Sequence, residues 1–175
     1  MNLPNFLTLT RILLVPFFVT AVVYRYFSWA IVIFFVAGIT DGLDGLLARS
    51  LHQKTRLGAF LDPLADKLLL TSAYITLGIL HLVPFWLPVV VVSRDIIIAL
   101  GMLIIMLLGY NYEIRPRMVS KATTVFQIVT VLAVLCAQYC SFISRHLLGL
   151  YAVTVIFTVV SGVYYLYLGM KILNP

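Results

Sequence analysis

Long apolar segments alternate with short polar breaks along the whole chain. About 20 apolar residues in a helix cross the hydrocarbon core of a bilayer, and six segments approach or exceed that length. We expect these helices over residues 6–24, 29–48, 60–81, 84–108, 120–140 and 147–170. The breaks are too short to separate domains, so the pattern predicts an all-α integral membrane protein with six transmembrane helices and a single domain over residues 1–175.

Composition supports a membrane protein. The 175 residues are 63% hydrophobic and 10% charged, whereas soluble domains are roughly half apolar and about a quarter charged. The polar residues before the first apolar segment include Pro4 and the potential helix caps Asn5 and Thr8. We interpret them as a short interfacial helix at the N-terminus. The alternative is that Asn5, Thr8 and Arg11 point toward a functional site.

Basic residues are distributed unequally between the two sides of the predicted bundle. The poor side has little beyond Arg25 and Arg145. The rich side collects Arg49, Lys54, Arg56, Arg115, Arg117, Lys121 and Lys171. The rich side should be cytoplasmic, which puts both termini there, at the inner membrane if the source is bacterial. The partners that we expect are membrane lipids and not nucleic acid.

Four of the six acidic residues lie in one polar break and at its edges: Asp41, Asp44, Asp62 and Asp66. The first two are three residues apart and the last two are four apart, so each pair shares one face of a helix. The connection between the two helices is short, which should make them antiparallel neighbours with converging carboxylates. Carboxylates at the edge of a bilayer core are costly and usually mark a functional site.

Converging carboxylates repel one another unless cations lie between them. Carboxylate oxygens suit Mg²⁺, Mn²⁺ or Ca²⁺ better than zinc, and two metals about 4 Å apart activate phosphoryl transfer. Gly42, Gly45 and Gly58 leave room for a phosphate or nucleotide, and Arg49 can pair with a phosphate. The four aspartates are therefore candidate metal ligands. An ion-coupled transporter is the alternative from another class, although its ion site should lie nearer the membrane midplane.

The aspartates belong to a longer motif. The chain reads DGLDGLLAR from Asp41 to Arg49, then eight residues, then GAFLDPLAD from Gly58 to Asp66. This resembles the signature DxxDGxxAR, eight residues, GxxxDxxxD of the CDP-alcohol phosphatidyltransferases at every defined position. The resemblance, which also takes in the segment from Leu3 to Arg11 and the six-helix pattern, implies an enzyme of phospholipid synthesis. Such an enzyme takes CDP-diacylglycerol, releases CMP and joins the phosphatidyl group to an alcohol.

The resemblance also implies roles for individual residues. Asp41, Asp44 and Asp62 would hold two Mg²⁺ or Mn²⁺ ions and the diphosphate, and Asp66 would be the general base. The residues implied to bind the CDP group are Asp41, Asp44, Gly45, Ala48, Arg49, Gly58 and Asp62. Family members are typically homodimers of six-helix protomers, with the cavity open to the cytoplasm and the inner leaflet.

A second polar set points to the acceptor. Arg94 lies inside an apolar segment, and Arg115, Arg117 and Lys121 lie at the predicted cytoplasmic edge. Together they would form an anion pocket, which favours an acceptor that carries a phosphate. We expect Arg94 and Asp95 to find different partners, because adjacent residues on a helix do not face each other. The alternative is an ion pair between the two within the membrane.

Two acceptors carrying a phosphate fit best, and inositol, serine and choline stay open as further acceptors. The N-terminus and residues 58–67 resemble the glycerophosphate phosphatidyltransferase branch of the family, whose acceptor is glycerol 3-phosphate, and we favour that acceptor. Ser93-Arg94-Asp95 and the Arg-Pro…Ser-Lys…Thr pattern over residues 115–124 resemble instead the cardiolipin synthases, whose acceptor is phosphatidylglycerol. Both acceptors carry a phosphate, so charge does not separate them.

Overall fold

A computed structural model describes residues 3–50, 56–108 and 118–173. Within its helices, the side chains of residues 3–8, 41–50, 56–64, 66, 106 and 172–173 lie outside the description. The described chain forms six α-helices: α1 (Leu3–Val23), α2 (Phe27–Ser50), α3 (Arg56–Ile79), α4 (Trp86–Leu107), α5 (Met118–Cys136) and α6 (Ser141–Leu173). They follow the six predicted ranges, so the all-α prediction is confirmed.

A separate N-terminal helix is not formed, and that prediction was wrong. Residues from Leu3 to Val23 make one continuous helix. Pro4 falls in the first turn, where a missing N–H breaks no intrahelical hydrogen bond. The polar residues that follow it therefore extend the first helix toward the N-terminus and do not interrupt it.

Three described helical stretches are long and apolar enough to cross a membrane. They are Trp86–Ile105, Met118–Cys136 and Ser141–Lys171. The described apolar stretches of the first three helices are shorter, at Leu9–Val23, Phe27–Thr40 and Lys67–Ile79. Each of these three stretches starts or stops where the described side chains do.

Two tight turns reverse the chain at the end of the bundle opposite the termini. Arg25 follows α1 with φ 60° and His81 follows α3 with φ 56°. The next residue in each turn donates its N–H back into the helix, from Tyr26 to the carbonyl of Ala21 and from Leu82 to that of Leu77. This is the left-handed helix ending, occupied here by residues other than glycine. Each turn makes its two helices antiparallel.

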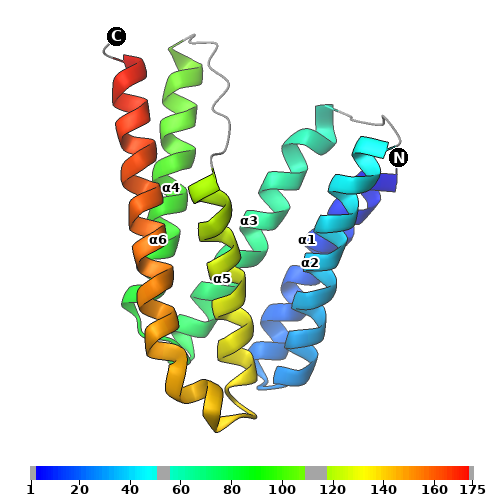
Figure 1. The fold of residues 1–175 in the computed structure, drawn as a ribbon. Helices are drawn as coiled ribbons and strands as arrows, with labels where there is room; N and C mark the ends of the chain where they lie inside the picture. The colour runs from blue at the N-terminus through cyan, green and yellow to red at the C-terminus, as the bar shows by residue number, and fades with distance from the viewer. Residues whose placement is uncertain (1–2, 51–55, 109–117, 174–175) are drawn as a thin grey trace.

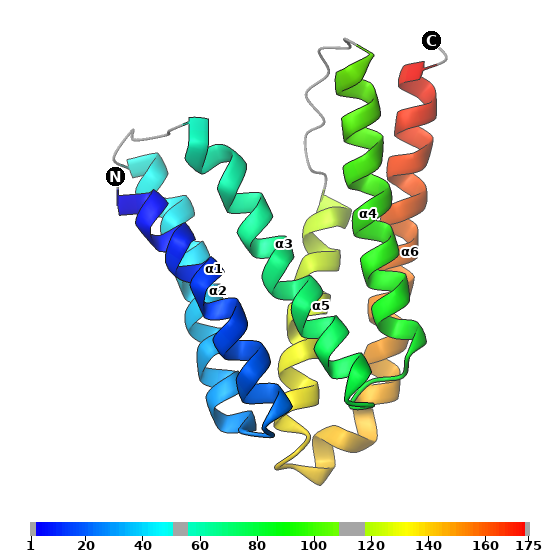
Figure 2. The same ribbon diagram turned by 180° about the vertical axis from the view of Figure 1, so that it is seen from behind.

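The helices form two groups that spread apart toward the end that carries both termini (Figures 1 and 2). In one group α1 packs against α2 and α3, and in the other α6 packs against α4 and α5. The inclined helix α3 also contacts α4 and α5, and α2 contacts α5. Apolar side chains of all six helices join in one core, with Phe18, Phe34, Leu77, Val91 and Val134 among them. The fold therefore joins its halves mainly through α3 and α5.

Candidate active site

The backbone places the motif aspartates on two antiparallel helices. Asp41 and Asp44 belong to α2, and Asp62 and Asp66 belong to α3. The two helices were expected to pack directly on each other, but within the described residues each packs chiefly against α1. Helix α1 is thus the described neighbour that the two motif helices share.

The side chains of the motif lie outside the described residues. The predictions that this applies to concern Asp41, Asp44, Gly45, Ala48, Arg49, Gly58, Asp62 and Asp66. Among the residues whose side chains are described, no three His, Cys, Asp or Glu come together as metal ligands would. The metal, nucleotide and general-base assignments therefore stay predictions.

Arg11 supplies a charge from α1 to this part of the bundle. Its side chain is only 1% exposed, although it belongs to the segment that was interpreted as interfacial. Arg11 lies 12 residues before the end of α1 and Asp41 lies 14 residues after the start of α2, so the two positions are at similar depth. Arg11 is therefore buried among the helices, and its pointing toward a functional site stays a prediction, while Asn5 and Thr8 lie outside the described side chains.

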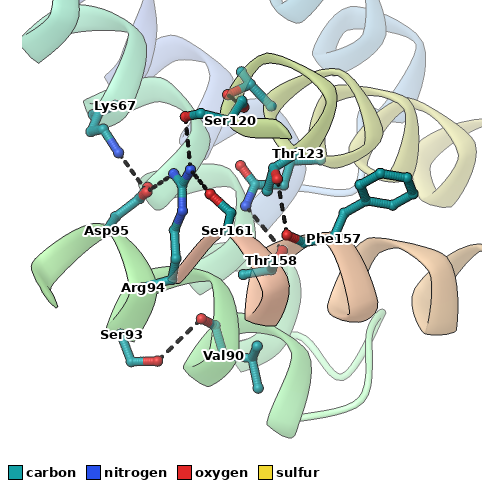
Figure 3. A network of polar contacts seen from close by, with 12 residues as sticks. Lys67, Val90, Ser93, Arg94, Asp95, Ser120, Thr123, Phe157, Thr158 and Ser161 are labelled. Atoms are coloured by element: carbon teal, nitrogen blue, oxygen red, sulfur yellow. Dashed lines mark hydrogen bonds and ion pairs between the residues drawn. The ribbon is translucent and has the colours of Figure 1, made fainter. Parts of the chain in front are cut away.

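A buried polar network connects α4, α5 and α6 (Figure 3). Nη2 of Arg94 donates to Oγ of Ser120 at 3.0 Å and to Oγ of Ser161 at 2.7 Å. Nη1 donates to Oδ1 of Asp95 at 2.7 Å. Arg94 and Asp95 are 5% and 8% exposed. Each of the two neighbours thus has a different partner, as expected, but they also pair with each other, because the long arginine side chain reaches the carboxylate.

Lys67 extends the network to α3. Its Nζ lies 2.5 Å from the same Oδ1 of Asp95, and the close-up shows it reaching across from the neighbouring helix (Figure 3). Lys67 directly follows Asp66, the last residue of the motif. Sequence analysis missed it, although a lysine at the start of an apolar helical stretch needs a partner. The network therefore ends one residue from the predicted general base.

The four predicted acceptor ligands are only partly described. Arg94 is buried with both terminal nitrogens already hydrogen-bonded, while its Nε is buried without a partner in the described structure. Lys121 is exposed and follows Ser120, which accepts from Arg94. Arg115 and Arg117 lie outside the described residues. The structure thus brings Arg94 close to the start of α5, and acceptor binding by these residues stays a prediction.

An apolar cleft opens between the two motif helices. It has a volume of about 250 Å³ and lies between α2, α3 and α5. Its lining includes Phe34, Gly38, Leu69, Leu70 and Leu132. No heavy atom lies within 4 Å of the place where Gly38 would carry a Cβ, apart from its own helix and neighbours. A cleft of this chemistry can hold hydrocarbon but no charged group.

Comparison with known proteins identifies the family. The profile of the CDP-alcohol phosphatidyltransferases matches residues 1–164. The chain belongs to the CDP-alcohol phosphatidyltransferase family. This confirms the family and the enzyme class predicted from the motif, and together with the three apolar helices it identifies an integral membrane protein.

Relatives with two different names are similar to the chain. The CDP-diacylglycerol–glycerol-3-phosphate 3-phosphatidyltransferase of Haemophilus influenzae is 45% identical over 104 residues, which are 56% of each chain. That of Bacillus subtilis is 37% identical over 150 residues, 77% of this chain and 76% of the relative. The cardiolipin synthase (CMP-forming) of Rattus norvegicus is 33% identical over 187 aligned positions, 97% of this chain but 62% of the relative. The chain thus spans less than two thirds of the first and the third of these relatives.

Proposed function

We propose that this phosphatidyltransferase transfers the phosphatidyl group of CDP-diacylglycerol to glycerol 3-phosphate and releases CMP. The observation that carries the proposal is the complete motif from Asp41 to Asp66, on two helices that both pack against α1. The names of the Haemophilus and Bacillus relatives favour this donor and this acceptor.

The proposed metal site consists of Asp41, Asp44 and Asp62, with Asp66 close by. A donor set made only of carboxylates fits two Mg²⁺ or Mn²⁺ ions. Such ions, when bound, neutralise charge on the diphosphate and on the leaving CMP. Gly45, Ala48 and Gly58 are proposed to lie along the nucleotide, with Arg49 at a phosphate.

Asp66 is the proposed general base, taking the proton from the acceptor hydroxyl as its oxygen attacks the lipid-bearing phosphorus. Arg94, Arg115, Arg117 and Lys121 are proposed to attract the acceptor's phosphate. The apolar cleft beside Gly38 suits an acyl chain of the donor, because it lies between the two motif helices and is lined by hydrocarbon.

We further propose that all six helices span the membrane and that the motif faces the cytoplasm. The distribution of Lys and Arg supports this orientation. Tyr24, Tyr26 and Trp29, at the opposite end, are more than 60% exposed, as aromatic residues are at a membrane interface. A homodimer is proposed from the family resemblance, and its test is the mass of the detergent-solubilised protein.

Phosphatidylglycerol is the second candidate acceptor, which would make the protein a cardiolipin synthase. One observation favours it: the similarity to the rat cardiolipin synthase extends over 97% of this chain. The Ser93-Arg94-Asp95 sequence agrees with that branch as well. The two candidates differ only in what occupies the acceptor site.

The test is an acceptor panel. Purified protein in detergent is given Mg²⁺ and CDP-diacylglycerol, with glycerol 3-phosphate, phosphatidylglycerol, inositol phosphate or serine offered separately. We expect CMP release with glycerol 3-phosphate and its loss after chelation of the metal by EDTA. Release with phosphatidylglycerol alone would establish the second candidate. Absence of release with every acceptor, together with ion flux in liposomes, would favour a transporter.

A further inference from the structure

Helix α3 is held to α4 at two places. Near the turn between them, the helices meet so closely that a Cβ on Gly78 would lie 2.8 Å from Cγ of Pro88. Eleven residues earlier in α3, Lys67 forms its ion pair with Asp95. The first half of α3, of which Lys67 is the last residue, leans away from α4 in both views (Figures 1 and 2). The ion pair therefore lies where contact between the helices ends.

Asp95 offers Lys67 a firmly held partner. The carboxylate is 8% exposed and shares Oδ1 between Lys67 and Arg94. The guanidinium of Arg94 is fixed in turn by Ser120 of α5 and Ser161 of α6. Because three helices hold this carboxylate, a change at Lys67 should displace α3 more than it displaces Asp95.

The ion pair of Lys67 with Asp95 lies next to Asp66 along α3, so a tilt of α3 at this pair would also move Asp66. Asp66 precedes Lys67 and lies 12 residues from Gly78, which is about 18 Å along a helix. A tilt of α3 by about 5° about the contact of Gly78 with Pro88 would move the backbone of Asp66 by about 1.5 Å. A misplacement of about 1 Å at a reacting group can cost roughly 100-fold in rate.

Stability alone gives little reason for this pair. Replacing a buried ion pair by apolar residues is often neutral or stabilising, and Lys67 is not even fully buried, with 42% of its side chain exposed. A cation and an anion in the apolar part of a membrane helix usually serve a function. Of the network, only Arg94 has a role so far in the proposed reaction; Lys67 and Asp95 have none.

We propose that Lys67 and Asp95 are positioning residues that hold the turn of α3 carrying Asp66 at a fixed distance from α4, α5 and α6. This proposal rests on the proposed function, in which Asp66 is the general base. Lys67 acts through the backbone of α3 and does not bind the substrate. Arg94 keeps Asp95 in place.

The kinetic test compares Lys67→Met and Asp95→Asn with the conservative variants Lys67→Arg and Asp95→Glu. With CDP-diacylglycerol and glycerol 3-phosphate, we expect the first two to lose about 10- to 100-fold in kcat, with both KM values within about twofold. Lys67→Arg should recover most of the rate, because it keeps the charge. Lys171→Met, which removes an exposed lysine at the end of α6, is the matched control and should equal the wild type.

A different result would overturn the proposal. A large rise in the KM for glycerol 3-phosphate at unchanged kcat would mean that Lys67 binds the acceptor's phosphate. A wild-type rate in Lys67→Met would mean that the pair does not matter. If Lys67→Met does not fold, Lys67→Gln takes its place. Wild-type protein that is inactive with every acceptor would refute the proposed function.

A distance measurement tests the positioning without any turnover. Nitroxide labels at Leu68→Cys on α3 and Leu103→Cys on α4, both exposed positions, report the separation of the helices after Cys136 and Cys140 are replaced by serine. We expect Lys67→Met to broaden the distribution of distances, or to shift its mean by more than about 1 Å, as the tilt requires. An unchanged distribution would contradict the proposal even if the rate falls.

Discussion

The interface of α1 with α2 and that of α5 with α6 differ in the chemistry of their side chains. The first consists of large and small apolar side chains, with the rings of Phe18 and Phe34 5.5 Å apart and Ala30 and Ala37 fully buried. The second carries a row of buried polar side chains. Thr130 and Thr154 share a hydrogen bond of 2.7 Å there, and Oγ1 of Thr123 donates to the carbonyl of Phe157 at 3.0 Å.

The two interfaces illustrate two ways in which helices associate in a membrane. Lipid is as apolar as leucine, so helices associate through close packing and through hydrogen bonds between them. The half that carries the motif uses close packing. The other half uses hydroxyl and amide groups, and from it Asp95 reaches Lys67 of α3. Mutations in either helix interface should therefore lower the free energy of unfolding, by an amount that depends on whether the lost contact is apolar packing or a hydrogen bond.

The largest effect is expected at the motif. Asp66→Asn removes the proposed base while keeping nearly the same shape, so CMP release should fall by at least about 100-fold, the usual range for loss of a general base. Nucleotide binding should remain largely intact, because Asp41, Asp44 and Asp62 are unchanged. The measurements are steady-state turnover and CMP binding by calorimetry.

Asp41→Asn serves as the comparison for Asp66→Asn. It should weaken metal-dependent nucleotide binding together with turnover, since Asp41 is a proposed metal ligand. An Asp66→Asn protein that turns over at the wild-type rate would show that another group takes the proton.

Among the stability effects, the largest is expected from Phe18→Ala. Phe18 is fully buried against Phe34, and a cavity left by phenylalanine costs about 3–5 kcal/mol in a soluble core. We expect a cost of about 2–3 kcal/mol here, because the chain unfolded in lipid loses packing but gains no contact with water. Phe17→Ala is the control, since the side chain of Phe17, the residue before Phe18, is 64% exposed. The free energy of unfolding is measured by reversible unfolding in mixed micelles. If Phe18→Ala and Phe17→Ala lower it equally, α1 packs against α2 with another face than the one that carries Phe18.

The sequence predicted what depends on local pattern. Hydrophobic length predicted the six helices, and the motif from Asp41 to Asp66 predicted the family through its resemblance to a known signature. Contacts between helices were not predictable in the same way. Nothing in the pattern tells that α1 packs against both α2 and α3, or that Arg94 bends back to its neighbour Asp95. Lys67 was overlooked because its partner is 28 residues away and on another helix.

A smaller effect is expected where α3 meets α4. Gly78→Ala puts a Cβ 2.8 Å from the rigid ring of Pro88, and overpacking of this kind costs about 1–3 kcal/mol. Gly149→Ala on α6 is the control, because its Cβ would have no heavy atom within 4 Å outside its own helix and neighbours. Alanine there should be neutral or stabilising by up to about 1 kcal/mol, through its helix propensity. If Gly78→Ala and Gly149→Ala have the same free energy of unfolding, Gly78 does not contact Pro88 as closely as in the structure.

The smallest effect is expected from Thr130→Val in the polar row. The hydroxyl of Thr130 donates to the carbonyl of Phe126 at 2.8 Å, which leaves Thr154 as the donor of the bond that the two threonines share. Without Thr130, the hydroxyl of Thr154 can turn to a carbonyl of its own helix, so the loss should be about 0.6 kcal/mol, the average for such bonds in membranes. The free energies of unfolding of Thr130→Val, Thr154→Val and the double variant give the coupling energy between the two threonines in a double-mutant cycle. A coupling above about 2 kcal/mol would make this one bond comparable with the packing of Phe18, and the contrast between the two interfaces would then be one of geometry and not of strength.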